Sequence, residues 1–218
     1  TLSGSGAIAG SIQLNNTLDY NPKYKWEIDF TKGSFGLEKQ SFSYHFGDNK
    51  TALLIQYLNS VSQNDFEYIN TGLPNSPLET QKNASKSSKQ YILNYGYQNK
   101  KNKIGFNLWQ SNSYREVPVG MLSNNPQAKQ WDDAFRTKFF YKQIANNHAI
   151  ELIYAYIEED FKYISNSIDS ELEAKNHFSS FEYQHYFKSF TTYLGSNLQQ
   201  RSVYSNYYSA IANEDILV

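Results

Sequence analysis

Apolar and polar residues alternate one by one over residues 24–58, which is the pattern of β-strands with two different faces. In the first run the apolar positions are Tyr24, Trp26, Ile28 and Phe30, and the residues between them are Lys25, Glu27 and Asp29. Because successive side chains of a strand point to opposite faces, this run has one apolar face and one charged face. Two further runs, 41–46 and 51–58, follow after short breaks. The three runs predict an antiparallel up-and-down meander.

The alternation returns later in the chain, and the connections between runs are short and long in turn. Further strand-like runs cover residues 90–98, 104–109, 135–142, 150–156, 181–187 and 194–198, and the long polar segments are 62–89, 110–133 and 158–176. In an antiparallel barrel every second connection lies at the same rim, so we expect the three long segments together at one rim. The pattern predicts an all-β fold, a transmembrane antiparallel up-and-down β-barrel of which roughly nine strands are present.

The composition agrees with strands that have one face in an apolar medium and the other in water. Aromatic residues make up 17% of the 218 residues, yet the mean hydropathy is −0.67. No run of about 18 apolar residues exists, which excludes a transmembrane helix, but a transmembrane strand of about 9–11 residues needs no such run. The net charge of −1 gives no reason to expect nucleic acid as a partner. The absence of cysteine excludes thiolate chemistry.

The alternation also assigns side chains to the two sides of the predicted barrel. The side chains that we expect to point outward to lipid are Tyr24, Trp26, Ile28, Phe30, Tyr91, Leu93, Tyr95 and Phe139. Those that we expect to point into the lumen are Lys25, Glu27, Asp29, Asn94 and Arg136. Roughly nine strands would leave two open edges whose hydrogen bonds lipid cannot satisfy. We therefore expect that this chain does not close on itself and that further sequence or a partner chain supplies the remaining strands.

Residues 5–14, Ser-Gly-Ala-Ile-Ala-Gly-Ser-Ile-Gln-Leu, resemble the closing segment of the plug domain of TonB-dependent outer-membrane receptors. In that family a Gly-Ser-Gly-Ala-Ile-Gly-Gly-Val-Ile type motif ends the plug, and the barrel starts shortly after. Ala9 stands where a glycine is common and Ser11 where a valine is common. The glycines of this plug-end motif are Gly4, Gly6 and Gly10, which allow tight turns or close packing.

The resemblance implies two parts, residues 1–20 as the end of a plug domain and residues 21–218 as the first part of a barrel of about 22 strands. It implies a place in the bacterial outer membrane, with lipid and lipopolysaccharide around the barrel. Such receptors take up a scarce nutrient as a small ligand, and an inner-membrane complex pulls on the plug through TonB. The segment that TonB would grip is expected before this chain. No cofactor and no enzymatic activity are implied.

Candidate ligand-binding residues come from a second resemblance, within the segment 110–133. Residues 114–118, Tyr-Arg-Glu-Val-Pro, and residues 130–132, Gln-Trp-Asp, resemble an extracellular-loop pattern in Bacteroidetes receptors of the siderophore and cobalamin type. The candidates that this implies are Tyr114, Arg115, Trp131 and Asp132. The two rings are rigid, and the guanidinium is a planar cation suited to a carboxylate or phosphate on a ligand. The alternative is an ordered loop whose aromatic residues pack on one another.

The sequence contains no catalytic constellation and no metal-ligand spacing. The histidines His45, His148, His177 and His185 lack the His-x-x-x-His spacing of a metal site. No serine lies in a Gly-x-Ser-x-Gly motif, and the carboxylates form no acid/base pair. The run Glu158-Glu159-Asp160 fits either a solvated charged segment or a calcium-binding loop of the kind that some receptors of this family have.

Two other functions stay open at this point. A passive porin-like or adhesive barrel would have similar strands, but no plug-like segment would precede them. A soluble all-β binding protein would have no reason to sort its connections into long and short ones.

Overall fold

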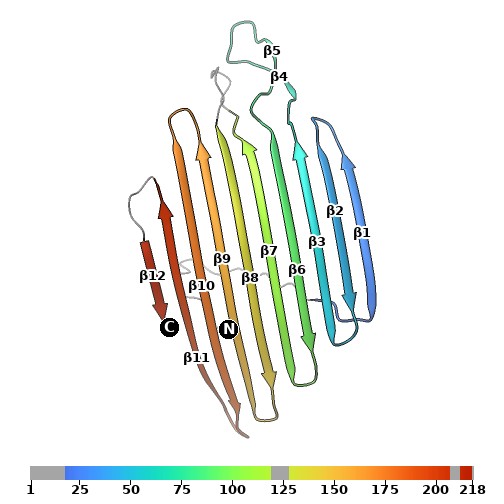
Figure 1. Cartoon of the computed structure of the whole chain (residues 1–218), viewed down its shortest axis with the longest axis vertical. Coiled ribbons are helices and arrows are strands. Elements are labelled where there is room, and N and C mark those ends of the chain that lie inside the picture. The colour runs from blue at the N-terminus through green and yellow to red at the C-terminus, as the bar shows by residue number, and fades with distance from the viewer. Residues whose placement is uncertain (1–17, 119–127, 207–211, 218) are drawn as a thin grey trace.

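The computed structural model describes residues 18–118, 128–206 and 212–217, and of the last six it describes only the backbone. Ten strands form one antiparallel sheet in the order β1-β2-β3-β6-β7-β8-β9-β10-β11-β12 (Figure 1). Their bounds are β1 Lys23–Lys32, β2 Glu38–Gly47, β3 Thr51–Ser62, β6 Lys86–Gln98, β7 Asn102–Glu116, β8 Lys129–Ile144, β9 His148–Ile164, β10 Asp169–Tyr186, β11 Thr191–Ser205 and β12 Ala212–Leu217. The prediction of an all-β, antiparallel, up-and-down arrangement is confirmed.

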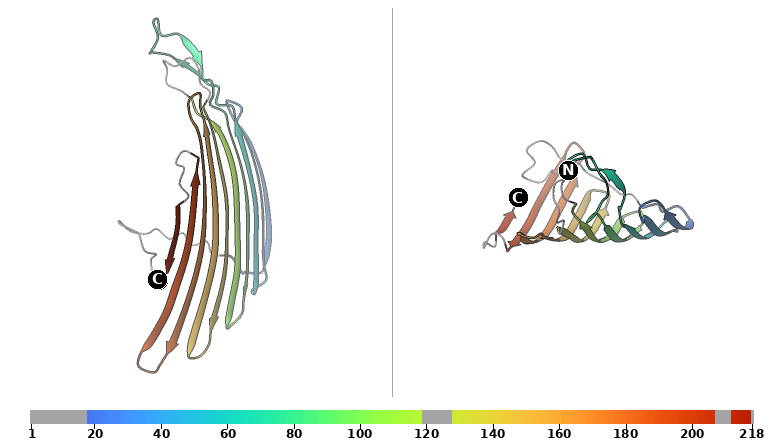
Figure 2. Two further views of the ribbon diagram at one scale, coloured as in Figure 1. Left: turned by 60° about the vertical axis from the view of Figure 1, so that its left-hand side comes forward. Right: turned by 90° about the horizontal axis from the view of Figure 1, so that it is seen from above.

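The sheet is one curved layer and does not close, so β1 and β12 are its two edges. Figure 2 shows the strands bowed toward one side, which gives the sheet a convex and a concave face. A separate hairpin, β4 Glu67–Ile69 with β5 Leu78–Thr80, connects β3 to β6 and leans over the concave side. The expectation that these strands do not form a closed barrel by themselves is confirmed.

The connections between the strands lie at two rims, as Figure 1 shows. The lower rim has the tight turns 48–50, 99–101, 145–147 and 187–190. The upper rim has the long connection 63–85, the turns 33–37 and 165–168, and the described ends, 117–118 and 128, of the connection between β7 and β8. The three segments that we expected at one rim therefore do share it.

Two of those three segments are much shorter than the sequence pattern predicts, and the third is a long connection that contains the hairpin β4–β5. Strand β7 extends to Glu116 and β8 begins at Lys129, so most of 110–133 is paired strand. Residues 158–176 also belong to strands β9 and β10, apart from a turn over 165–168. In these stretches charged residues occur on both faces, as Glu158 and Glu159 do, which weakens the apolar/polar alternation in the sequence. The backbone hydrogen bonds of a ladder do not depend on side-chain polarity, so the strands continue.

The main sheet also has one strand more than the roughly nine expected. Strand β12 pairs with β11 between Val203↔Ala212 and Leu198↔Leu217. Its sequence, Ala-Asn-Glu-Asp-Ile-Leu, is short and does not alternate between apolar and polar residues, so it gives little periodic signal. The plug-end motif with Gly4, Gly6 and Gly10 lies outside the described residues.

Small residues line one row of the sheet near the lower rim on the concave face. The pairing Ala52↔Gly96, Gly96↔Gly105 and Gly105↔Phe140 makes a continuous row across four strands. The ring of Phe140 lies over Gly105, because a Cβ at position 105 would be 2.0 Å from Cε1 of that ring. An aromatic ring that covers a strand glycine in this way shields its backbone.

Replacing Gly105 by alanine should destabilise the sheet by about 1–3 kcal/mol, because the new methyl group overlaps the ring of Phe140. The measurement is the temperature at which the protein unfolds. The double variant Gly105→Ala/Phe140→Leu should lose less stability than the sum of the two single variants, since the shorter side chain relieves the overlap. Additive losses would mean that the ring does not rest on Gly105.

Candidate functional site

The two faces of the sheet differ in chemistry, and the strand register decides which side chains share a face. Directly paired residues of neighbouring strands point to the same side. The pairs Tyr24↔Phe46, Leu53↔Tyr95 and Phe106↔Phe139 carry one apolar row from β1 to β8. The sequence-based prediction that these side chains divide between two faces is therefore confirmed. All the residues expected to point outward lie on one face, and all those expected to point into the lumen lie on the other.

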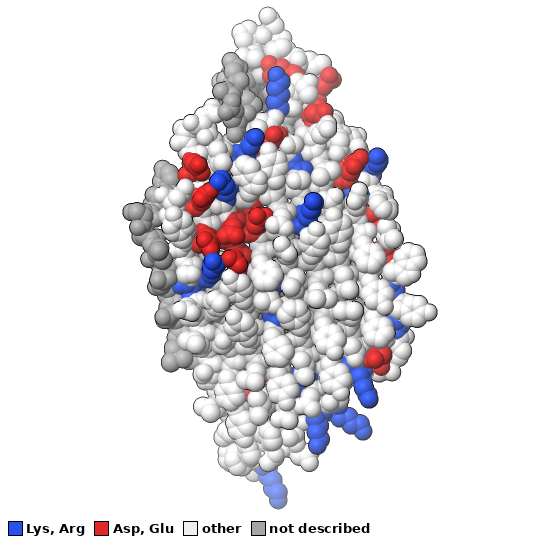
Figure 3. All heavy atoms as spheres, in the orientation of Figure 1, with Lys and Arg blue, Asp and Glu red and all other residues white. Residues whose placement is uncertain are grey.

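We call the apolar surface of the convex face the apolar belt. It consists of alternate positions in residues 24–30, 42–46, 53–57, 91–97, 104–108, 135–141, 150–156, 181–183 and 194–198. Among these convex-face positions there is no Asp, Glu, Lys or Arg. The four longest of these segments, 24–30, 91–97, 135–141 and 150–156, have seven residues each and span about 20 Å at about 3.3 Å per residue, close to the hydrophobic band of a transmembrane barrel. Figure 3 shows this broad, nearly uncharged middle region.

Nothing in the described part of the chain covers the apolar belt. Trp26 is 65% exposed and Phe30 is 73% exposed. The buried hydrophobic residues are Ala52, Ala128 and Ala149, so the described residues have no core of large side chains. Single exposed apolar residues are common on protein surfaces, but a continuous apolar surface of this size is not. It marks a contact with an apolar partner or medium.

Aromatic rings gather at both ends of the belt. At the upper end the rings of Tyr57 and Tyr91 are 5.2 Å apart, and those of Phe135 and Tyr156 are 6.2 Å apart. At the lower end the ring-bearing residues are Tyr24, Tyr97, Tyr141 and Tyr183. Tyrosine suits a boundary between apolar and aqueous surroundings, because its ring is apolar and its hydroxyl group is polar.

Polar side chains on the concave face are bonded mainly to one another. Nδ2 of Asn107 donates to Oδ1 of Asn94 over 2.8 Å. The guanidinium of Arg136 lies 4.4 Å from the ring centre of Trp109 and pairs with Glu159. Neighbouring strands thus share hydrogen bonds and charge pairs across a face that suits contact with water or with other polar protein segments.

The chain enters the sheet from the concave side. Residues 18–21 lie across the small-residue row just before β1: a Cβ at position 96 would be 2.2 Å from the hydroxyl oxygen of Tyr20 and 2.8 Å from Cδ1 of Leu18. A Cβ at position 47 would be 2.5 Å from the carbonyl oxygen of Asn21. The amide of Asn49 donates to the carbonyl of Tyr20 over 2.7 Å. Glycine at 47 and 96 therefore allows this entry segment to lie close to the sheet.

Above the apolar belt, the same convex face carries a charged strip on β8, β9 and β10. Asp133, Asp160 and Glu173 are paired directly across these strands. Lys162 pairs with Glu171, and Lys175 pairs with both Glu158 and Glu173. Figure 3 shows the cluster of carboxylates over these strands.

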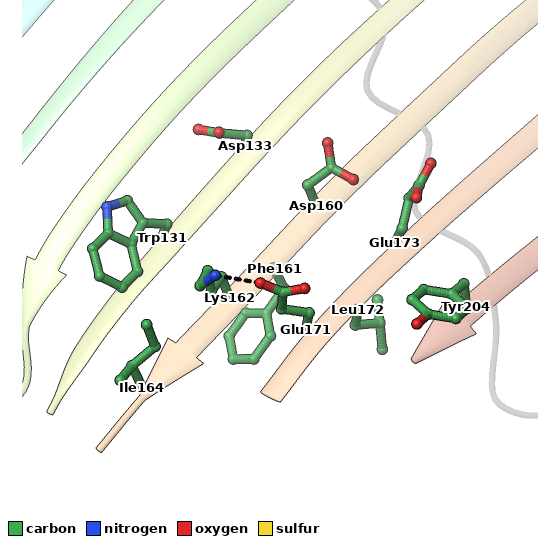
Figure 4. A pocket seen from close by; sticks show the side chains of 10 residues that line it. All are labelled: Trp131, Asp133, Asp160, Phe161, Lys162, Ile164, Glu171, Leu172, Glu173 and Tyr204. Atoms are coloured by element: carbon green, nitrogen blue, oxygen red, sulfur yellow. Dashed lines mark hydrogen bonds and ion pairs between the residues drawn. The ribbon is translucent and has the colours of Figure 1, made fainter. Parts of the chain in front are cut away.

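The charged strip borders a hollow of about 620 Å³ that also has aromatic walls. Figure 4 shows Trp131 on one side and Tyr204 on the other, with the pair Lys162–Glu171 between them. Within the described residues no group of three or more His, Cys, Asp and Glu side chains is arranged to hold a metal ion. The strip therefore offers charged and aromatic side chains on one exposed part of the convex face.

The acidic run Glu158-Glu159-Asp160 does not converge on one point. Its alternation places Glu158 and Asp160 on the convex face, and Glu159 on the concave face beside Arg136. Because the run lies in strand β9 and not in a loop, its three carboxylates cannot surround one calcium ion as a loop would.

The four candidate ligand-binding residues lie on strands, and they divide between the two faces. Tyr114 and Trp131 are paired on the convex face, with ring centres 5.2 Å apart. Arg115 and Asp132 are on the concave face, where Arg115 pairs with Gln130 and Nε2 of Gln130 donates to Asp132 over 2.9 Å. The expectation that all four sit in one extracellular loop is wrong, because β7 and β8 continue through them.

Sequence reasoning missed the charged strip because it assigned these residues to loops. The signal was present as alternation in residues 156–162, where Tyr156, Glu158, Asp160 and Lys162 occupy every second position. Charged residues at every second position indicate a strand just as apolar residues at every second position do. They do not indicate which side of the strand is buried.

Comparison with known proteins gives no family model that matches this chain and no match among curated proteins. Within the described residues no helix has the length and apolar character needed to cross a membrane.

Partial burial raises the pKa of the Asp160 carboxyl group, and the like charges of Glu158 and Glu173 in the charged strip raise it further. A carboxyl group with a raised pKa in the folded state stabilises the fold below its unfolded pKa of about 3.9, and this contribution is lost as the pH rises through the folded value. Asp160→Asn should therefore raise the unfolding temperature at pH 7.

The gain from Asp160→Asn should shrink as the pH falls and vanish well below the unfolded pKa of about 3.9, where Asp160 is protonated in both the folded and the unfolded state. Asp132→Asn is the matched control, because Asp132 lies on the other face and accepts hydrogen bonds from Gln130. The control should give no gain at either pH. A gain for Asp160→Asn that did not depend on pH would contradict the charge explanation.

Proposed function

We propose that this chain forms part of the wall of a TonB-dependent outer-membrane receptor, which takes up a scarce nutrient such as a ferric siderophore or cobalamin. The apolar belt then faces lipid and lipopolysaccharide, and the concave face lines the lumen. The height of the belt, its tyrosine borders and the absence of acidic and basic residues from it all support a membrane-facing surface.

The observation that carries the proposal is the side from which the chain enters the sheet. Residues 18–21 rest on the concave face, against Gly47 and Gly96. A segment that came from a plug inside the barrel would reach β1 from this side. A porin-like or adhesive barrel has no need for such an approach, so the entry segment favours the receptor over the passive barrel.

The open edges of the sheet support a larger barrel. An edge strand has a row of unpaired backbone N–H and C=O groups, which hydrocarbon cannot satisfy. In the proposed receptor further strands pair with β1 and β12 and close the wall. An intact mass of the native protein near the 25.2 kDa of this chain would contradict the large receptor.

The polar concave face suits the transport step of the proposal. A ligand captured at the upper rim would pass along a wall of amide, hydroxyl and charged side chains, while the plug moves under force from the TonB complex. The strands of the wall hold these side chains at fixed positions. The proposed role does not include chemical conversion of the ligand.

A charge placed in the apolar belt should impair assembly far more than the same charge on the adjacent residue. Leu93 and Ile92 are neighbours on β6, partly exposed, and on opposite faces. Leu93→Lys in the complete receptor should cost about 2–4 kcal/mol and lower the folded fraction in the outer membrane, whereas Ile92→Lys should be tolerated.

Cysteine labelling gives an independent reading of the same two faces. A water-soluble reagent should modify a cysteine at Glu27 and spare one at Ile28 in membranes. Equal labelling of the two positions, or equal tolerance of lysine at 92 and 93, would overturn the membrane orientation of the belt.

Ligand capture should depend on the concave-face members of the candidate set. Arg115 is exposed near the upper rim on the concave face, diagonal to Asp132. Arg115→Ala should weaken binding of a ferric siderophore or cobalamin probe to the assembled receptor by about tenfold, the loss of one charge-assisted hydrogen bond. Tyr114→Ala is the matched control, since its ring points to the convex face. Weaker binding in the control alone would remove Arg115 from the site.

A further inference from the structure

We infer that a lysine hollow at the lower rim binds the phosphate groups of anionic phospholipids in the adjoining leaflet. We define the lysine hollow by Lys50, Lys100 and Lys101, with Asn49, Gln98, Asn99 and Asn102 between them. It is a shallow depression of about 810 Å³ formed by two neighbouring turns. The inference rests on the proposed function in one respect, that the apolar belt lies in a membrane.

The two turns that form the lysine hollow are fixed against each other. The amide of Gln98 donates to the carbonyl of Lys50 over 2.6 Å, which ties the end of β6 to the turn before β3. In the second turn, Oδ1 of Asn99 accepts from the amides of Lys101 at 2.9 Å and Asn102 at 2.8 Å. The backbone positions of the three lysines are therefore set by the fold, while their long side chains can adapt to a ligand.

The positive charge of the lysine hollow has no counter-charge in its wall. No carboxylate lines it, and no ion pair in the described residues includes Lys50, Lys100 or Lys101. The carboxylate of the adjacent turn, Asp48, accepts hydrogen bonds from the amides of Thr51 at 2.5 Å and Lys50 at 3.0 Å. These bonds, and Lys50 to a smaller extent, lower the pKa of Asp48. That carboxylate thus serves mainly to close its own turn.

The lysine hollow lies next to the lower end of the apolar belt. Tyr97 is the last belt residue of β6, and its hydroxyl oxygen is 3.4 Å from Nδ2 of Asn99 in the hollow. Figure 3 shows Lys and Arg side chains projecting along this lower edge of the convex face. A lipid whose acyl chains lie along the belt would have its headgroup at the level of these lysines.

The chemistry of the lysine hollow suits a lipid phosphate with net negative charge. Each ammonium group near a membrane surface contributes about 1 kcal/mol of attraction to anionic lipid. The side-chain amides of Gln98, Asn99 and Asn102 add hydrogen-bond donors for phosphate oxygens. A zwitterionic headgroup carries no net charge and gains much less. The charged strip at the upper end of the belt has mainly carboxylates, so it suits an anionic headgroup less than the lysine hollow does.

The test compares two triple variants of the complete receptor. The variant Lys50→Gln/Lys100→Gln/Lys101→Gln removes the charge of the lysine hollow. The control Lys39→Gln/Lys86→Gln/Lys89→Gln removes the same charge from the upper halves of β2 and β6. Phosphatidylglycerol and phosphatidylcholine that stay bound to the purified receptor are counted by native mass spectrometry.

The hollow variant should retain phosphatidylglycerol at least about tenfold more weakly than wild type, with phosphatidylcholine unchanged. The control should match wild type. Equal retention by all three proteins would overturn the inference, and so would competition by millimolar inorganic phosphate as effective as that by the lipid, which would identify a free-phosphate site. Flotation of each protein with liposomes separates this result from the proposed function: a receptor that floats but shows no lysine effect contradicts only the lipid site.

Discussion

The backbone hydrogen-bond ladder is the interaction on which this structure depends. The described residues form one layer whose buried hydrophobic residues are three alanines, so no packed core holds the strands together. Nine antiparallel strand pairings join β1 to β12 instead, each a continuous run of opposed residues. Such a layer needs surroundings that match its two faces, because an apolar face left in water would favour collapse or association.

The face to which each side chain points could be predicted from the sequence, but the residues at which the strands end could not. Both outcomes follow from where the two faces of the sheet meet different surroundings. Within the apolar belt, side-chain polarity alternates because the two faces meet different surroundings, and residues 24–30 display this plainly. Above the belt both faces carry charged residues, such as Glu158 and Glu159, so residues 158–164 look like a loop although they are strand. The ladder is satisfied by backbone groups alone, and its extent leaves little mark on side-chain composition.

The candidate site shows the same limit at the level of single residues. The residue types at 114, 115, 131 and 132 suggested one recognition loop, but recognition of a loop requires knowing where the neighbouring strands stop. Because β7 and β8 run through these positions, the alternation of side chains along β7 places the consecutive residues Tyr114 and Arg115 on opposite faces. The entry segment at 18–21 gave even less signal, since its place is decided by the absence of side chains at Gly47 and Gly96, far along the chain.

The strict register of the ladders has a consequence for the kinds of genetic change that this wall can accept. In the paired strands that the structure describes, residue numbers run in opposite directions without a bulge, as in Lys23↔Gly47 through Lys32↔Glu38. Deleting or inserting one codon within a belt strand would exchange the faces of every residue beyond it, sending charges to the apolar side. A change of two codons would restore the parity. Length variation inside the belt should therefore occur in even steps, whereas the connections 63–85 and 117–128 can change by any number of residues.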